Sequence, residues 1–133
     1  MPHHRTSGVF LHLTSLPGPD GIGDLGAGTR TFLDFLERAD QSYWQFCPLG
    51  PTSDVHGHSP YAADSAFAGN SLLVDLRELV ERGYLAESDL GGPVGADPNA
   101  VDYDAVAAYK RDLLWTAYER FDAAADEVDR ESF

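Results

Sequence analysis

The residue types best suited to chemistry gather in a loop that spans residues 50–70. Asp54, His56 and His58 place a carboxylate beside a His-x-His pair, a grouping that can bind zinc. Glycine flanks this stretch, and the neighbouring sequence offers no evident fourth ligand, so a solvated loop is the favoured interpretation. We therefore predict no metal site here.

A second group in the same loop is suited to binding rather than to catalysis. Ser59 and Tyr61 flank Pro60, whose ring fixes the backbone and lowers the cost of ordering the turn. The tyrosine ring offers a flat apolar face, and its hydroxyl stays free to hydrogen bond. Because the loop follows the apolar segment 43–49, it occupies the position where α/β proteins place binding groups. Ser59 and Tyr61 are the candidate binding residues, and the alternative for Tyr61 is an ordinary surface tyrosine.

Three further features have both a chemical and a structural interpretation. His12 lies in an expected strand, where a hydrogen-bonded core histidine is favoured over a catalytic base. Trp44 lies in an apolar segment and is expected in the core, although an indole can also stack on a ligand. The run at 21–26, Gly-Ile-Gly-Asp-Leu-Gly, lacks the lysine of a phosphate loop and the full Gly-x-Gly-x-x-Gly spacing, which argues against nucleotide binding. Asp24 within this run is expected to be structural.

A predicted strand–helix–strand unit positions these residues. Residues 8–13 and 42–49 are apolar and predict two strands, the second covered on both faces as parallel strands tend to be. A glycine-rich loop at 17–28 precedes a helix over about residues 29–39. The apolar stripe of this helix consists of Phe32, Phe35, Leu36 and Ala39. The order strand, helix, strand predicts parallel pairing in a right-handed unit.

Two more helices are expected after the loop. The first is capped by Asn70 or Ser71 and ends at Gly83, the residue type most common just past a helix C-terminus. The second runs from about residue 103 to 125. Its apolar stripe consists of Val106, Leu113, Ala117 and Phe121, with Tyr109, Leu114 and Tyr118 beside it.

Composition narrows the classes of partner. The 133 residues carry 22 acidic and 9 basic side chains, and the net charge of −13 repels nucleic acid and anionic membranes. Lys110 is the single lysine, and such an excess of carboxylates suggests a protein adapted to high salt. No apolar run reaches membrane-spanning length and no signal-type segment is evident, so we expect a cytoplasmic protein. The single cysteine, Cys47, is expected to be buried.

The expected elements do not complete a fold. Two parallel strands flanked by helices would leave bare strand edges, which proteins avoid. A (β/α)8 barrel usually needs about 250 residues. We therefore predict an α/β chain that forms the first strands and helices of such a barrel, its N-terminal part.

Five motifs lie in order along the chain, at residues 7–17, 21–26, 43–52, 59–70 and 101–114. Together they resemble one enzyme family, the 4-α-glucanotransferases, also called amylomaltases or disproportionating enzymes. The resemblance implies that residues 1–133 form an N-terminal fragment of the catalytic barrel. Within it, residues 50–70 would be the substrate loop, and residues 84–133 the start of an inserted helical subdomain.

The resemblance also implies an activity. Members of this family move α-1,4-glucan segments between maltooligosaccharides, amylose or glycogen-like glucans by a retaining double displacement that uses two carboxyl groups. The chemistry requires no cofactor and no metal. The family's catalytic carboxylates lie further along the barrel, and no acidic residue here matches their motifs. We therefore assign no catalytic residue, and we expect the 133 residues alone to be inactive and poorly stable.

Within this resemblance, Tyr61 corresponds to the tyrosine that stacks on the sugar at the cleaved bond. Ser59 corresponds to a serine that can contact sugar hydroxyls. The loop departs from the family pattern at His58, where an acidic residue or asparagine is usual, and at Ala62, where glutamine is usual. Two alternatives to the transferase stay open: a non-catalytic glucan-binding remnant and a hydrolase of the α-amylase type.

Overall fold

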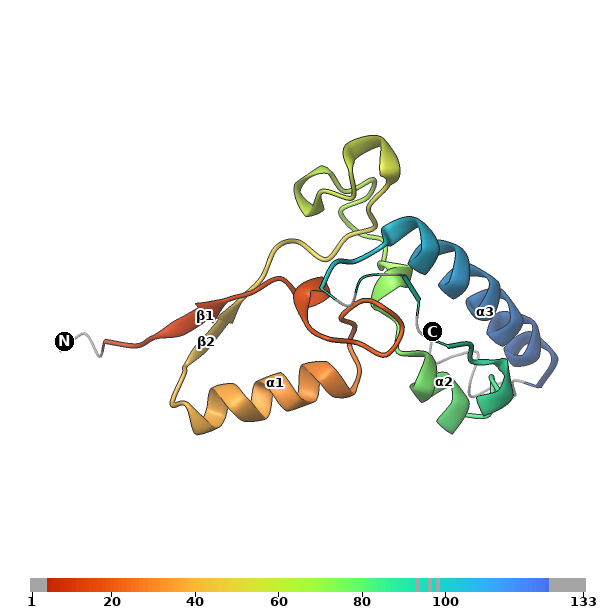
Figure 1. Cartoon of the computed structure of the whole chain (residues 1–133), viewed down its shortest axis with the longest axis horizontal. Helices are drawn as coiled ribbons and strands as arrows, with labels where there is room; N and C mark the ends of the chain where they lie inside the picture. Colours follow the sequence, from red (N-terminus) through yellow and green to blue (C-terminus); the bar gives the residue numbers. More distant parts are fainter. Residues whose placement is uncertain (1–4, 93, 96, 98, 125–133) are drawn as a thin grey trace.

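The computed structural model describes residues 5–92, 94–95, 97 and 99–124 (Figure 1). These residues form two short strands, three α-helices and several single turns of 3₁₀-helix. The strands and α-helices are β1 (Gly8–Phe10), α1 (Ala27–Arg38), β2 (Tyr43–Gln45), α2 (Leu76–Glu81) and α3 (Tyr103–Ala124). Strands and α1 lie at one end of the molecule and α2 and α3 at the other, with the loop 50–70 projecting between them.

The two strands are parallel, with Gly8 opposite Tyr43 and Phe10 opposite Gln45, and α1 makes the crossover between them. This confirms the predicted strand–helix–strand order. Both strands are shorter than the predicted 8–13 and 42–49. The pairing ends one hydrogen bond beyond β1, from the Leu11 amide to the Gln45 carbonyl (3.0 Å). Backbone pairing needs a neighbour, and none of the other described segments joins this sheet.

The expectation that the second strand is covered on both faces is wrong for the described residues. Tyr43 is 65% exposed and Phe46 is 42% exposed. Trp44 is the half-buried residue of β2, and its ring packs edge-on against Phe32 of α1 (5.0 Å between centroids) and against Phe46 (5.5 Å). Helix α1 therefore covers one face of the strand pair, and the other face is open.

The predicted stripe of α1 is buried only in part. Leu36 is 5% exposed and Phe32 is half-buried, whereas Phe35 is 51% exposed and Ala39 lies beyond the last helical residue. The helix begins at Ala27 rather than near residue 29. The apolar side of α1 is therefore wider than the surface against which this helix packs in the described part of the chain.

A single helix over residues 70–83 is not formed. Asn70 caps a 3₁₀ turn, Ser71–Leu73, by accepting a hydrogen bond from the Leu72 amide (3.0 Å). The chain is then extended at Val74, and Asp75 caps α2 by accepting from the Arg77 amide (2.9 Å). Gly83, with φ +79°, ends this helix as predicted.

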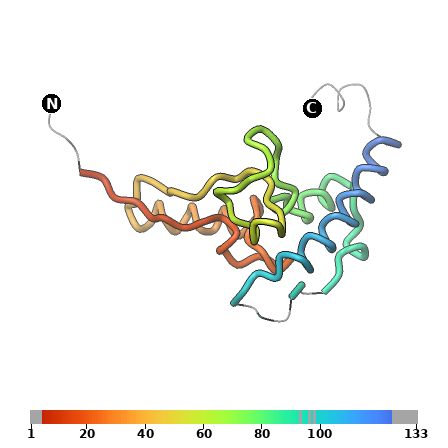
Figure 2. Tube along the Cα trace, turned by 90° about the horizontal axis from the view of Figure 1, so that it is seen from above, coloured from red at the N-terminus to blue at the C-terminus, as the bar shows by residue number. Residues whose placement is uncertain are grey.

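The core lies where α3 crosses the preceding segments (Figure 2). One apolar cluster is formed by Ile22, Leu72 and Val106, and a second by Leu76, Leu85 and Ala117. The predicted stripe of α3 supplies Val106 and Ala117, at 0% and 5% exposed. The predicted helix end at residue 125 lies outside the described residues.

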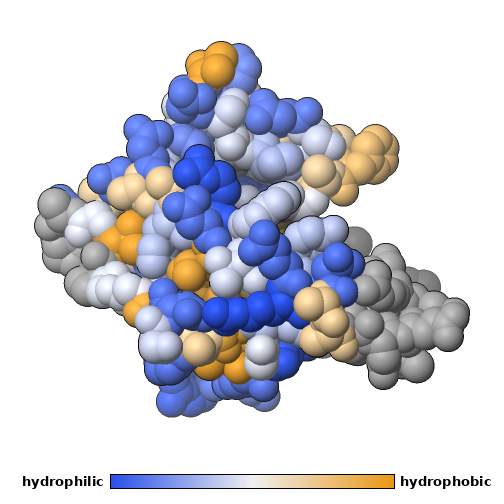
Figure 3. Space-filling view, turned by 90° about the vertical axis from the view of Figure 1, so that its right-hand side faces the viewer, coloured by the Kyte–Doolittle hydropathy of each residue, from blue (hydrophilic) through white to orange (hydrophobic). Residues whose placement is uncertain are grey.

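On the face that carries α3, hydrophilic residues predominate and hydrophobic residues form small separate areas (Figure 3). No helix within the described ranges is long and apolar enough to cross a membrane.

Candidate functional site

The loop 50–70 is closed at its base by its own hydrogen bonds. The Asn70 side-chain amide donates to the Gly50 carbonyl (3.1 Å), which joins the two ends of the loop. Inside the loop, the Asp64 amide donates to the Pro51 carbonyl (2.9 Å) and Ser53 donates to the Asp64 carboxylate (3.2 Å). The loop is therefore a closed structural unit that rises from the body of the molecule (Figure 1).

A buried lysine holds the chain just after the loop. Lys110 of α3 is 1% exposed, and its ammonium donates to the carbonyls of Leu72 (2.8 Å) and Val74 (2.7 Å) and to the Asp24 carboxylate (3.3 Å). These three acceptors match the three donors of an ammonium group. One of these acceptors is a carbonyl of the 3₁₀ turn Ser71–Leu73 and another is the Val74 carbonyl, in the break before α2, so the lysine binds the backbone on both sides of Leu73.

Burial shifts both partners of this ion pair toward their neutral forms. Desolvation lowers the pKa of Lys110, and the neighbouring Asp24 charge opposes that shift. Desolvation likewise raises the pKa of Asp24, opposed by Lys110 and by the hydrogen bond from the Gly26 amide. Asp24 also accepts a side-chain hydrogen bond from Thr29 at its backbone carbonyl. The prediction that Asp24 is structural is confirmed.

The two candidate binding residues lie at a short turn within the loop 50–70. Tyr61 belongs to the 3₁₀ turn Pro60–Ala62 and is 76% exposed. Ser59, which immediately precedes this turn, is half-buried. The Tyr61 hydroxyl accepts a hydrogen bond from the thiol of Cys47 (3.5 Å). Cys47 is buried, as predicted. The Tyr61 ring is thus tethered through its hydroxyl while its faces remain available to a ligand.

The remaining loop residues do not assemble a metal site. Asp54 and His56 are exposed, whereas His58 turns inward against α3. Among the described residues, no group of three or more His, Cys, Asp or Glu side chains is arranged to hold a metal ion. His58 stacks on Tyr103, a contact between distant segments that the sequence did not reveal.

Trp44 and His12 each have a chemical and a structural interpretation in the sequence, and the structure shows what surrounds each side chain. Trp44 donates to the Leu11 carbonyl (2.8 Å) and packs in the aromatic cluster of α1 and β2. His12 is half-buried, and its Nδ1 has no hydrogen-bond partner among the described residues. Desolvation lowers the pKa of His12. The expectation that Trp44 lies in the core holds in part, since Trp44 is only half-buried. His12 was expected to be a hydrogen-bonded core histidine, but its Nδ1 lacks that hydrogen bond among the described residues.

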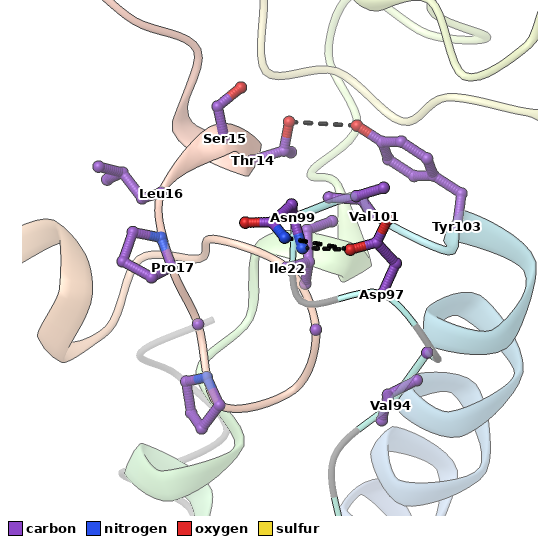
Figure 4. Close-up of a pocket in the computed structure, with 15 residues that line it drawn as sticks. Thr14, Ser15, Leu16, Pro17, Ile22, Val94, Asp97, Asn99, Val101 and Tyr103 are labelled. Carbon is purple, nitrogen blue, oxygen red and sulfur yellow. Dashed lines mark hydrogen bonds between the residues drawn. The ribbon is translucent and has the colours of Figure 1, made fainter.

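A cleft of about 920 Å³ separates the glycine-rich turn after β1 from the segment leading into α3 (Figure 4). The hydrogen bond from the Tyr103 hydroxyl to Thr14 (3.1 Å) crosses between its two sides. The described lining is mainly backbone, proline and aliphatic side chains, with Asp97 as its one carboxylate. Ser59 and Tyr61 do not line this cleft, so the candidate binding residues and the cleft are separate features.

Comparison with known proteins gives a consistent result. The family model of the 4-alpha-glucanotransferases, glycoside hydrolase family 77, matches residues 11–133. A 4-alpha-glucanotransferase of Thermus thermophilus is 49% identical over 129 residues, and one of Streptococcus pneumoniae is 48% identical over 130 residues. Each match covers 97% of this chain and 25% of the relative.

A solved structure is similar over the same range. The amylomaltase from Streptococcus agalactiae in complex with acarbose matches with a TM-score of 0.88 and 39% identity, covering 97% of this chain and 26% of that protein. The chain therefore spans about a quarter of the length of the relatives it matches. On the family model and these identities, the chain belongs to the 4-alpha-glucanotransferase family, glycoside hydrolase family 77.

Proposed function

We propose that this chain is the N-terminal part of a 4-α-glucanotransferase, which moves α-1,4-glucan segments from one maltooligosaccharide to another. The observation that carries the proposal is the family match over residues 11–133, together with 49% identity to a relative of that name. Substrates of the class would be maltooligosaccharides, amylose or glycogen-like glucans. We place the enzyme in the cytoplasm, as the sequence predicts.

The described architecture supports the proposal that this chain forms the first part of a (β/α)8 barrel. In such a barrel, parallel strands alternate with helices that cover the outside, and each strand has a neighbour on both sides. Here β1 and β2 are parallel with α1 between them, and Phe10 and Tyr43 are 60% and 65% exposed. Further strands of the barrel would cover these residues. In the same scheme, residues 50–70 form the substrate loop and residues 84–133 begin an inserted helical subdomain.

Tyr61 and Ser59 are the residues of this chain that would contact sugar. An exposed aromatic ring suits the apolar face of a pyranose, and a serine beside it suits the hydroxyls. Tyr61 has the required exposure, and its hydroxyl tether to Cys47 limits the motion of the ring. The likeness to an amylomaltase in complex with acarbose, a maltooligosaccharide analogue, supports a ligand of this class.

The reaction would be a retaining double displacement on two carboxyl groups. We assign neither carboxyl group to this chain. The residues here would bind and orient the glucan, and the rest of the enzyme would supply the nucleophile and the acid. The mechanism needs no cofactor or metal.

The test is a product analysis with the full-length protein and maltotriose, at high salt. Disproportionation gives glucose together with maltooligosaccharides longer than the donor. A hydrolase of the α-amylase type would give only shorter products. Binding of maltooligosaccharides without any new product would favour the non-catalytic remnant.

A further inference from the structure

His58 joins the loop 50–70 to the first turn of α3. Its imidazole lies parallel to the ring of Tyr103, with 4.6 Å between centroids and 10° between planes. Tyr103 in turn donates its hydroxyl to Thr14, in the turn after β1 (3.1 Å). A residue of the loop is thereby linked, through one aromatic ring, to both α3 and the N-terminal segment.

The imidazole is held on its other sides as well. His58 Nδ1 lies 3.2 Å from the Thr52 hydroxyl, within the same loop. Its Nε2 faces the Asp104 carboxylate at 4.0 Å and has no hydrogen-bond partner among the described residues. The side chain of His58 is 12% exposed, whereas that of Asp104 is 91% exposed. The ring is thus nearly enclosed between the loop and the helix.

The backbone at this position is unusual for a residue other than glycine. His58 has φ +54° and follows Gly57, which has φ +58°. A histidine in the left-handed region is held there by its surroundings, because the conformation costs about 1–3 kcal/mol. Its amide donates to the Ser53 carbonyl (2.9 Å), which fixes the turn. The next residue is Ser59, so this turn sets the direction in which the Ser-Pro-Tyr segment leaves.

We propose that His58 is a positioning residue for sugar binding: its stacking on Tyr103 fixes the orientation of Ser59 and Tyr61 relative to α3. The inference rests on the proposed function, since it assigns the sugar contact to Ser59 and Tyr61. His58 itself takes no part in bond cleavage. Its loss weakens glucan binding more than it slows the chemical step, because the loop no longer presents the sugar-contacting residues in a fixed orientation.

The test uses the full-length protein and the substitution His58→Asn. Asparagine tolerates the left-handed backbone and retains an amide that can reach Thr52, so the variant removes mainly the stacked ring. We expect KM for maltotriose to rise about three- to tenfold, with kcat changed less than twofold. His56→Asn is the matched control, since His56 is exposed in the same loop, and it is expected to leave both constants unchanged.

A double-mutant cycle tests the route through Tyr103. Tyr103→Leu removes the stacking surface, whereas Tyr103→Phe keeps the ring and removes only the hydrogen bond to Thr14. If stacking is the link, the KM effects of His58→Asn and Tyr103→Leu are not additive, and Tyr103→Phe has the smaller effect. Additive effects would overturn the proposal, as would an equal fall in kcat and kcat/KM.

Hydrogen–deuterium exchange gives a readout that does not depend on turnover. His58→Asn is expected to speed amide exchange in residues 59–70, while exchange in β1, α1 and β2 stays unchanged. Unchanged exchange in residues 59–70 would overturn the proposal even if the parent enzyme is active. If the parent protein does not transfer glucan, the proposed function fails, and the exchange result alone still decides whether His58 anchors the loop. Should His58→Asn not fold, the Tyr103 pair of variants provides the same two readouts.

Discussion

The ammonium of Lys110 and the carboxylate of Asp24 form a buried ion pair, 3.3 Å apart, that ties α3 to the turn ahead of α1. The side chains are 1% and 5% exposed. The same ammonium donates hydrogen bonds to the carbonyls of Leu72 and Val74, directly after the loop 50–70. Three segments that are distant in sequence therefore meet at a single buried charge.

Replacing Lys110 by methionine is expected to destabilise the protein by about 3–5 kcal/mol, because it leaves the buried Asp24 carboxylate without its counter-ion and removes the ammonium donor from two carbonyls. Chemical denaturation of the full-length protein measures this loss. The double variant Lys110→Met with Asp24→Asn should recover part of it, since the uncompensated charge is gone. A loss below about 1 kcal/mol for Lys110→Met would contradict the assigned role.

The amphipathic pattern predicted α3 well but did not predict that Lys110 is buried. Positions 106, 110, 113 and 117 follow one helical stripe, and three of them were identified as apolar. The stripe does not predict that Lys110 is buried, because an ammonium is normally solvated. Its acceptors come from Asp24 and from residues 72–74, and no local spacing rule could have supplied them. A lysine inside an apolar stripe, and the only lysine in the chain, was the available signal.

Other differences from the sequence-based predictions also arise from tertiary contacts. The helix expected over 70–83 breaks at Val74, where the carbonyls of Leu72 and of Val74 accept hydrogen bonds from Lys110. The loop, the Ser-Pro-Tyr turn and the burial of Cys47 were predictable from turn residues and hydrophobicity. The stacking of His58 on Tyr103 was not, because it depends on how α3 returns to the loop.

Tyr61 provides a test of the sugar-binding role. Tyr61→Ala is expected to lower kcat/KM for maltotriose about tenfold or more, equivalent to at least about 1.4 kcal/mol of lost stabilisation. Tyr61→Phe keeps the ring and should stay within about threefold of the parent. Because Tyr61 is 76% exposed, neither change should lower the melting temperature noticeably. Equal effects of the two substitutions would show that the ring face is not the contacting group.

An ion pair between α3 and the segment after α2 gives a prediction about acid stability. Hydrogen bonds from Arg120 and from the Ala86 amide hold the pKa of Asp89 below its ordinary value of 3.8. A carboxylate whose pKa is depressed by folding adds stability above its unfolded pKa, and this contribution disappears as pH falls through the folded pKa. The difference in melting temperature between the parent and Asp89→Asn should therefore be largest above about pH 4 and should vanish in stronger acid. A difference that grows on acidification would contradict the assignment.

Two glycines with different surroundings, Gly23 and Gly69, test how tightly the turn after β1 is packed. A side chain at Gly23 would meet the carbonyl oxygens of Leu13 and Leu16, whereas nothing lies within 4 Å of the corresponding position at Gly69. Gly23→Ala is expected to destabilise the protein by about 1–3 kcal/mol, the usual cost of forcing atoms into a packed site. Gly69→Ala should change the free energy of unfolding by less than about 0.5 kcal/mol. Similar results for both substitutions would mean that the turn can relax.

Transfer of glucan to a labelled acceptor tests the proposed glucanotransferase activity most directly. The full-length protein is incubated with maltotriose and ¹³C-labelled glucose, and the oligosaccharides are analysed by mass spectrometry. The proposed glucanotransferase places ¹³C-glucose at the reducing end of new maltooligosaccharides. Cleavage of maltotriose to shorter, unlabelled sugars with no labelled oligosaccharide would contradict it and identify a hydrolase.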